Sequence, residues 1–332
     1  MLGEIRVQFR KIAWGVVAGA GVVLALTSTA STSVAGATPE PVKPATPSGP
    51  APSLVQEAGG ARPVHGDHPT APTSSIGIAG ADRPAARPAG ALATPQRGNG
   101  RYGPTNVPAG QDYQIWSYCP AGMVATGGGE SNTSLGGITL HSSYALSDGS
   151  GWFVDVSNGS GAAVGVTVYS VCFSGLTSYK QTTQAAVGVY ESGYVGHAAC
   201  PLGQAVGTGG WAGSYDEYIN YMQTADNEGW IGFTRTAAST TPTLQVICAN
   251  GFNRLQNDGW SGPNMAPGQD TSVGGDCPAG TVLVSGGGGK NDGITTHIRV
   301  TDTYPTAQGW NVYAHNDSTL TDYPEAFVMC GS

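Results

Sequence analysis

The sequence predicts an all-β protein in which three tandem β modules follow a disordered, Pro/Ala-rich N-terminal arm. The first observation is a motif that occurs three times after residue 118: Cys-Pro-x-Gly, a glycine pair, a Gly-Trp pair and a closing cysteine. The second is that short β-branched runs of alternating polarity, separated by Asn-Gly and Asp-Gly turns, fill the space between the motifs. The third is that no helical period is found after residue 100. A repeated unit of this size indicates an array of similar modules.

Residues 1–37 have the features of a secretory signal peptide. Three basic residues precede an apolar run over 12–26, and the small residues at 35–37 fit a cleavage site. The apolar run is shorter than the roughly 20 residues that a membrane-spanning helix needs. We therefore expect a secreted, extracellular chain with no membrane anchor after cleavage.

Residues 38–104 form the predicted arm. Proline recurs every two or three residues at its start and aliphatic side chains are sparse, so the segment buries too little apolar surface to offset its conformational entropy. The most strand-like island contains Ser75, Ile76 and Ile78. We predict that this island docks on a partner by adding a strand to its sheet. The alternative is that the arm is a passive spacer.

The three modules cover residues 105–185, 186–261 and 262–332. In each, the glycine of Cys-Pro-x-Gly fits a turn with positive φ, and the valines that follow fit a core strand. The glycine pair predicts a bulge or a close approach of two backbones. The repeated Trp residues predict core positions, with exposed sugar-stacking as the alternative. The modules are either separate β-sandwiches or units packed about a pseudo-threefold axis, and both arrangements remain open at this point.

The six cysteines predict three disulfides. Only one pairing repeats within every module: Cys119–Cys172, Cys200–Cys248 and Cys277–Cys330. Loops of this size each contribute roughly 4 kcal/mol of stability in the chain-entropy model. The competing register would link neighbouring modules through Cys172–Cys200 and Cys248–Cys277. An even cysteine count fits an oxidising, extracellular compartment.

The charge of the repeat region limits the classes of partner. From residue 102 onward, 17 acidic residues face five basic ones. A nucleic-acid interface needs clustered Lys and Arg, so nucleic acid is excluded as a partner. Other secreted proteins, bound through the arm and the acidic body, and glycans remain as partners.

The sequence contains none of the motifs that would indicate catalysis. It has no Gly-x-Ser-x-Gly, no His-Glu-x-x-His, no phosphate loop and no zinc-spaced cysteine pair, and we predict no enzyme activity, metal or cofactor. One binding face is predicted in the second module, where aromatic and acidic residues cluster. Such a set suits a protein hot spot or a sugar platform, with core packing as the alternative. Its members are Trp211, Tyr215, Asp216, Glu217, Tyr218 and Tyr221.

The repeated motif resembles a β repeat of secreted and phage-associated bacterial proteins. The layout of signal peptide, long Pro/Ala-rich arm and acidic, cysteine-stapled body is similar to the adaptor subunit of bacterial umbrella toxin particles. That resemblance implies an arm that engages a large toxin subunit and a body that bridges to a lectin subunit. We therefore expect a non-enzymatic adaptor of an extracellular assembly. The alternatives are a carbohydrate- or cell-surface-binding lectin-like module and, after it, a secreted hydrolase.

Overall fold

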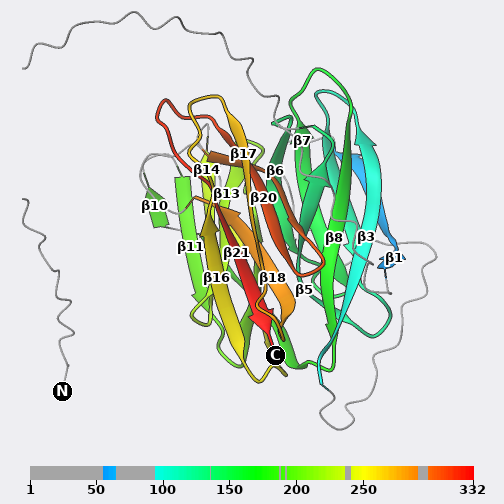
Figure 1. The fold of residues 1–332 in the computed structure, drawn as a ribbon. Helices are drawn as coiled ribbons and strands as arrows, with labels where there is room; N and C mark the ends of the chain where they lie inside the picture. Colours follow the sequence, from blue (N-terminus) through cyan, green and yellow to red (C-terminus); the bar gives the residue numbers. More distant parts are fainter. Residues whose placement is uncertain are drawn as a thin grey trace, which may run out of the picture. The chain divides into compact units, whose positions relative to one another are not determined.

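The structure is a computed structural model that describes residues 55–64, 94–134, 136–186, 188–190, 193–235, 241–290 and 298–332. Within these ranges every regular element is a β-strand, which confirms the predicted all-β class (Figure 1). The predicted signal peptide and the island with Ser75, Ile76 and Ile78 lie outside the described residues.

The strands form three seven-stranded sheets, named A, B and C here and given in spatial order. Sheet A comprises β1 (Val55–Glu57), β3 (Gln96–Val107), β8 (Val164–Ser174), β5 (Val124–Asn132), β19 (Ile298–Pro305), β20 (Gly309–Asn316) and β17 (Asp270–Asp276). Sheet B comprises β2 (Gly59–Val64), β4 (Asp112–Tyr118), β7 (Gly151–Asn158), β6 (Ile138–Ala145), β12 (Gln204–Trp211), β15 (Thr243–Asn250) and β9 (Thr177–Ala185). Sheet C comprises β10 (Gly188–Tyr190), β11 (Gly193–Ala199), β14 (Glu228–Arg235), β13 (Glu217–Ala225), β18 (Val282–Gly289), β21 (Glu325–Gly331) and β16 (Leu255–Ser261).

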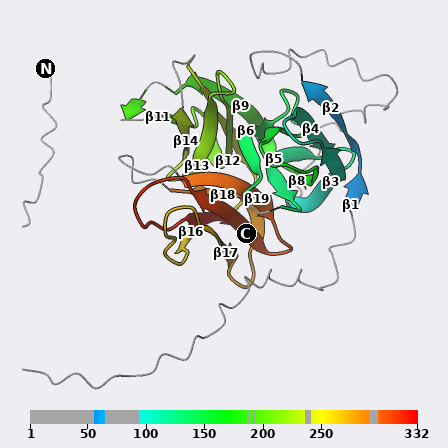
Figure 2. The same cartoon turned by 90° about the horizontal axis from the view of Figure 1, so that it is seen from above.

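Each sheet is shared by two of the three sequence repeats. The structural units span residues 96–174, 177–250 and 255–331, because β9 pairs with β15 and β16 pairs with β21; the boundaries predicted at residues 185 and 261 therefore shift. Each unit gives three strands to each of two sheets: the first to A and B, the second to B and C, and the third to C and A. The seventh strand of each sheet is an additional edge strand, β1 in A, β2 in B and β10 in C. The repeats are therefore not separate sandwiches but units of one cyclic, pseudo-threefold arrangement. Figure 2 shows the edge strands of the units at three corners, with β5, β12 and β18 between them.

Each seam is a short antiparallel pairing near the middle of a sheet. Thr303 pairs with Glu130 in sheet A, Gly210 with Ser143 in sheet B, and Tyr221 with Gly289 in sheet C. The strands β5 and β18 also meet directly, because the Thr126 hydroxyl donates to the Val284 carbonyl over 2.6 Å. One continuous hydrophobic core lies behind these strands and includes side chains from all three units.

The pseudo-symmetry extends to individual residues. A register shift interrupts β5, β12 and β18 at the same place, next to Thr126, Val206 and Val284. A second shift recurs in β6, β13 and β19. The glycines after the first shift bring backbones together, as predicted: a Cβ atom on Gly287 would lie 2.5 Å from the Met222 carbonyl oxygen. The predicted turn glycines Gly122, Gly203 and Gly280 all have positive φ, of 77°, 86° and 86°.

The structure confirms the predicted disulfide pairing. Cys119–Cys172, Cys200–Cys248 and Cys277–Cys330 are bonded, with partners 53, 48 and 53 positions apart in the sequence. The competing register is thereby excluded. Each bond joins the residue that follows β4, β11 or β17 to the last strand of the same unit, β8, β15 or β21.

The predicted arm contributes strands that the sequence interpretation did not include. β1 pairs in parallel with β3 over Val55–Glu57, and β2 pairs antiparallel with β4 over Gly59–Val64. β3 itself begins at Gln96. Residues 55–64 thus extend both open edges of the first unit. Their glycine-rich sequence has little strand propensity, and they are strands because two sheet edges offer unpaired backbone groups.

Candidate functional site

The predicted binding residues of the second unit follow β12 and enter β13, and they do not form one exposed platform. Glu217 is fully buried and Tyr221 is 1% exposed, so these two side chains belong to the interior. Tyr218 is also buried, and Asp216 is exposed. Trp211 and Tyr215 are half-buried and lie against the outer face of sheet B, opposite to the main core.

On that outer face, three successive cross-strand pairs of β4 and β7 each form one layer of side chains, called a tier below. The register pairs Trp116 with Phe153, Gln114 with Asp155, and Asp112 with Ser157. Because successive strand residues alternate between faces, these six side chains share one side of β4 and β7. The segment from Trp211 to Glu217 contributes one group to each tier.

The first tier is apolar. Tyr144 lies 4.9 Å from Phe153 and 5.0 Å from Trp211, measured between ring centroids. Trp116, Tyr144 and Phe153 are all buried and form a cluster separate from the main core. Trp211 is therefore a packing residue that fixes the second unit against the first, as the alternative of core packing anticipated.

The second tier contains a buried carboxyl group. The Tyr215 hydroxyl donates to both Asp155 oxygens over 3.2 Å, and the Gln114 amide donates to Asp155 Oδ2 over 3.3 Å. Arg62 in β2 donates to the Gln114 side-chain oxygen over 2.9 and 2.6 Å. Burial raises the pKa of Asp155 to about 7, although both hydrogen bonds act in the opposite direction. Asp155 therefore holds a proton over much of the acidic range.

The third tier contains a serine–histidine contact. His141 Nε2 lies 2.7 Å from Ser157 Oγ, and His141 Nδ1 lies 2.5 Å from the Glu217 carbonyl oxygen. A nucleophile and its base make such a contact in hydrolases. Here Ser157 also donates to Asp112 Oδ1 over 2.5 Å, so its single proton is already engaged. His141 is only 3% exposed, and burial lowers its pKa. The arrangement links strands of two units and leaves the hydroxyl engaged on both sides.

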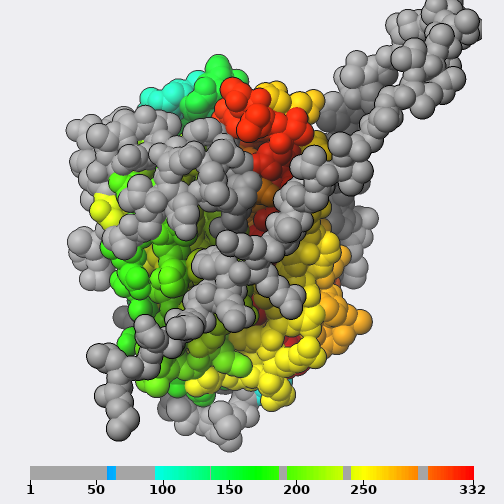
Figure 3. Space-filling model, turned by 90° about the vertical axis from the view of Figure 1, so that its left-hand side faces the viewer, coloured from blue at the N-terminus to red at the C-terminus, as the bar shows by residue number. Residues whose placement is uncertain are grey.

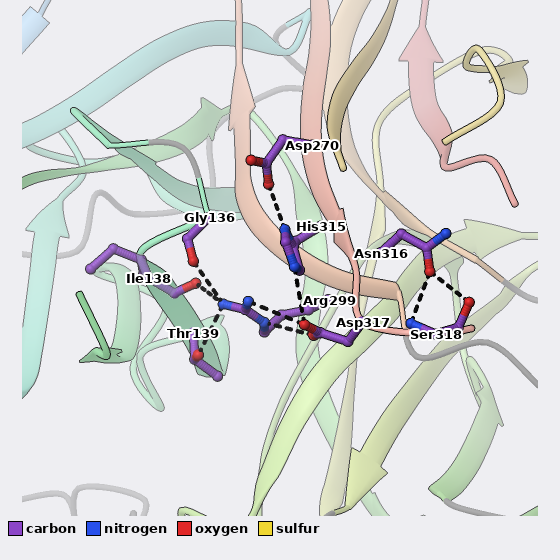
Figure 4. A network of polar contacts seen from close by, with 9 residues as sticks. All are labelled: Gly136, Ile138, Thr139, Asp270, Arg299, His315, Asn316, Asp317 and Ser318. Atoms are coloured by element: carbon purple, nitrogen blue, oxygen red, sulfur yellow. Dashed lines mark hydrogen bonds and ion pairs between the residues drawn. The ribbon is translucent and has the colours of Figure 1, made fainter. Parts of the chain in front are cut away.

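A further polar network joins the third unit to the first (Figure 4). His315 Nδ1 lies 2.8 Å from Asp270 Oδ1, and His315 Nε2 lies 3.2 Å from Asp317 Oδ1. Arg299 binds Asp317 over 3.0 Å and donates to the carbonyl oxygens of Gly136 and Ile138 over 3.1 Å each. Its guanidinium thus satisfies backbone acceptors of the first unit next to the seam of sheet A.

The second unit departs from the others at its repeated tryptophan. Trp152 and Trp310 are fully buried in the main core, as predicted, and their indole N–H groups donate to Ser143 and Thr303 over 2.9 and 2.8 Å. The prediction of a core position is wrong for Trp230, which is half-buried and outside that core. Its ring stacks on His197, with centroids 4.5 Å apart and planes at 16°.

The physical reason is the register of one hairpin. Trp152 pairs with Ala145, and Trp310 with Pro305. In the second unit the hairpin has the two-residue turn Asp226–Asn227, with both residues at positive φ. This turn places Gly229, opposite Thr224, at the sheet position that Trp152 and Trp310 have in the other units. Trp230 follows one position later. A shift of one residue turns a strand side chain to the other face.

Trp230 lines a pocket of about 630 Å³ that residues of sheets B and C form together. The pocket walls come from β12, the β13–β14 hairpin, β16 and β21, and Figure 3 shows the side of the molecule on which β16 (yellow) adjoins the second unit (green). The lining residues are Gln204, Ala205, Gln223, Ala225, Asp226, Asn227, Trp230, Leu255, Asn257 and Met329. Sequence reasoning missed this pocket. The available signal was the shorter Cys200-to-Trp230 spacing of the second unit.

Within the described ranges, no group of three His, Cys, Asp or Glu residues is placed to hold a metal ion. The same ranges contain no helix long and apolar enough to cross a membrane. No protein-family model and no curated protein sequence matches the chain.

Proposed function

We propose that the chain is a secreted, non-enzymatic adaptor of an extracellular assembly, in which the connection between β2 and β3 is the docking element. The observation that carries the proposal is the anchoring of residues 55–64 on both edges of the first unit. β2 ends at Val64 and β3 begins at Gln96, so the intervening segment is attached to the body at both ends.

Attachment at both ends favours docking for an entropic reason. A partner that binds a tethered segment is held at a high effective concentration next to the body, and the segment loses less freedom than a free tail would. The strand-like island with Ser75, Ile76 and Ile78 lies within this connection. Backbone pairing of the island with a partner's sheet edge supplies affinity, and its two isoleucines supply side-chain contacts on alternate positions.

The body supplies the second contact of the adaptor. Its sheets are shared between units, and buried contacts such as Trp211 with Tyr144 fix the units together, so it offers a rigid support. The acidic surface of the repeat region fits a neutral or basic partner. A toxin particle of the umbrella type is the assembly that the sequence layout resembles.

Secretion rests on the signal peptide features of residues 1–37 and on the three intramolecular disulfides, which are typical of extracellular proteins. The proposed absence of catalysis is supported by the contact between Ser157 and His141 in the third tier of sheet B. There His141 is buried, Ser157 is half-buried, and the serine hydroxyl is engaged by Asp112 as well as by His141.

The test is affinity capture from culture supernatant with matched baits. One bait is the full mature chain. A second carries a Gly/Ser segment of equal length in place of residues 65–93, which leaves β1, β2 and β3 intact. A third carries the same replacement over residues 38–53, as the control. A truncation that begins at Arg101 is unsuitable because it removes both added strands and cuts β3.

We expect the full chain and the control to retain a protein partner that the 65–93 variant loses. Retention of the same partner by the 65–93 variant would show that the connection is not the docking element. Capture of no protein by any bait would contradict the adaptor function itself.

A further inference from the structure

The half-buried tryptophan of the second unit, Trp230, is held in a defined orientation. His197 in β11 and Gln223 in β13 flank Trp230 in β14 on opposite sides. One face of the indole stacks on the His197 ring, so the other face is turned toward Gln223 and the pocket. His197 is in turn 3.4 Å from Glu228. Leaving part of a large aromatic ring in contact with solvent costs hydrophobic free energy, and a partly exposed ring held in one orientation is typical of a binding surface.

Polar groups of two kinds surround the ring. The Asp226 carboxylate and the Gln204 amide have no hydrogen-bond partner among the described residues, and both reach the pocket. By contrast, Gln223 and Asn257 hold each other in place. With the Asn257 amide turned so that its neighbours are satisfied, the Asn257 side-chain oxygen accepts a hydrogen bond from Gln223 Nε2 over 3.0 Å. The pocket therefore combines free polar groups with amides that are held in place.

The apolar side of the pocket is small. Leu255, Met329 and the methyl groups of Ala205 and Ala225 provide it. Met329 is buried, whereas Asp226 and Asn227 are exposed at the rim. A flat aromatic ring, several amides, one carboxylate and few aliphatic groups do not suit a lipid or a purely apolar ligand.

We propose that this pocket binds a neutral saccharide, with one pyranose ring stacked on Trp230. The C–H groups on one face of a pyranose carry partial positive charge and are attracted to the electron-rich face of an indole. Its hydroxyl groups both donate and accept, which matches the Gln204 amide and the Asp226 carboxylate; the Gln223 and Asn257 amides are already hydrogen-bonded to each other and shape the wall. Asp226 is the one charged lining residue, and its sign disfavours uronic acids and other anionic sugars. The volume of about 630 Å³ falls within the range of small-molecule sites.

Among the described residues, the second unit has the half-buried tryptophan at this sheet position, for a structural reason. Trp310 of the third unit fills the core, and Asn311 lies at the sheet position that Trp230 has in the second. In the first unit that position is Phe153, which is buried under Tyr144 and Trp211. The one-residue register shift of the Asp226–Asn227 hairpin thus creates the binding position.

The test uses the full mature chain and a panel of ligands in isothermal titration, followed by tryptophan fluorescence. The panel contains the methyl glycosides of glucose, galactose, mannose and N-acetylglucosamine, their common disaccharides, glucuronic acid and a neutral peptide. We expect at least one neutral sugar to bind and to change the tryptophan emission. Trp230→Ala should weaken its affinity by about tenfold or more. Asp226→Asn should also weaken it.

Two controls keep the test decisive. Asn311→Ala changes the pseudo-equivalent position of the third unit and should leave the affinity within about twofold. Trp230→Phe retains a smaller ring and should bind with intermediate affinity. The proposal fails if no neutral sugar binds, if Trp230→Ala leaves the affinity unchanged, if glucuronic acid binds as tightly as the neutral sugars, or if only the peptide binds. None of these outcomes depends on the connection at residues 65–93.

Discussion

Thr208 in β12 occupies the space next to Gly229 in β14, where a Cβ atom on the glycine would come within 2.7 Å of the threonine Oγ1. The Thr208 hydroxyl donates to the Gln223 carbonyl oxygen over 2.9 Å. The other units have the reverse arrangement, with the glycine in the inner strand and the large side chain opposite. A Cβ atom on Gly128 would overlap Trp152, and one on Gly286 would overlap Trp310. In every unit a side chain therefore fills the space between these two strands. It is a threonine from the inner strand in the second unit and a tryptophan from the opposite strand in the other two.

The glycines beneath the core tryptophans are therefore expected to be intolerant of alanine. In Gly128→Ala and Gly286→Ala the new methyl group has no room, because the indole ring is buried and cannot move away. We expect each to lower the free energy of unfolding by about 3 kcal/mol. Urea denaturation followed by circular dichroism measures this. Gly161→Ala is the control, since nothing lies within 4 Å of its Cβ position. Equal stability of all three variants would contradict the packing described here.

The two kinds of tryptophan should differ in their contribution to stability. Trp152→Ala removes a fully buried ring and its hydrogen bond to Ser143, and should cost about 3–5 kcal/mol. Trp230→Ala removes a half-buried ring outside the main core, and should cost about 1 kcal/mol. Thermal and urea unfolding of the two variants side by side tests the difference. A cost for Trp230→Ala as large as that for Trp152→Ala would place Trp230 in the core.

Asp155 should make the stability depend on pH. Burial raises its pKa to about 7 from an ordinary value of 3.8, so the folded chain retains a proton that the unfolded chain releases between these values. Its stabilising contribution is complete below about pH 4 and is lost as the pH rises through 7. Relative to Asp155→Asn, the wild type should lose up to roughly 4 kcal/mol over this range. Unfolding curves of both proteins from pH 4 to 8 measure the loss. Parallel pH profiles would mean that Asp155 is ionised in the folded chain.

The part of the arm that precedes Arg97 should resist trypsin for a chemical reason visible in the sequence. All four basic residues between 38 and 96, Lys43, Arg62, Arg83 and Arg87, are followed by proline. Trypsin-like proteases do not cleave such bonds efficiently, because proline in that position does not fit the productive backbone conformation. We expect intact-mass spectrometry to show no tryptic cut between residues 38 and 96 under conditions where thermolysin cuts there. A fragment that begins at Pro44, Pro84 or Pro88 would contradict this expectation.

Some parts of the structure follow directly from the repeated motif. The pairing of Cys119 with Cys172, the positive φ of Gly122 and the core positions of Trp152 and Trp310 each have a local cause and recur in the sequence. The same motif gave a wrong position for Trp230. Its Gly-Trp pair is present, but the short turn at Asp226–Asn227 shifts the pair by one residue along the strand. Because side chains alternate between the two faces of a strand, this shift places Trp230 on the opposite face.

Other parts depend on contacts between distant segments. Asp112, Gln114 and Trp116 alternate along one strand, and Phe153, Asp155 and Ser157 alternate along another, but only the fold brings them next to Tyr215. The sharing of each sheet by two units could not be predicted either, because the sequence of an edge strand does not specify which other strand it pairs with. Residues 59–64 have the composition of a linker and become a strand because the edge of β4 is available.

The measurement that tests the adaptor function most directly is hydrogen–deuterium exchange of the full mature chain with and without its captured protein partner. Strand addition protects backbone amides, so we expect slower exchange in the peptide that contains Ser75, Ile76 and Ile78 when the partner is bound. Exchange in β1, β2 and the three sheets should be unchanged or locally slower at a second contact. Unaltered exchange throughout residues 65–93, with protection confined to the body, would contradict the proposal that this connection is the docking element.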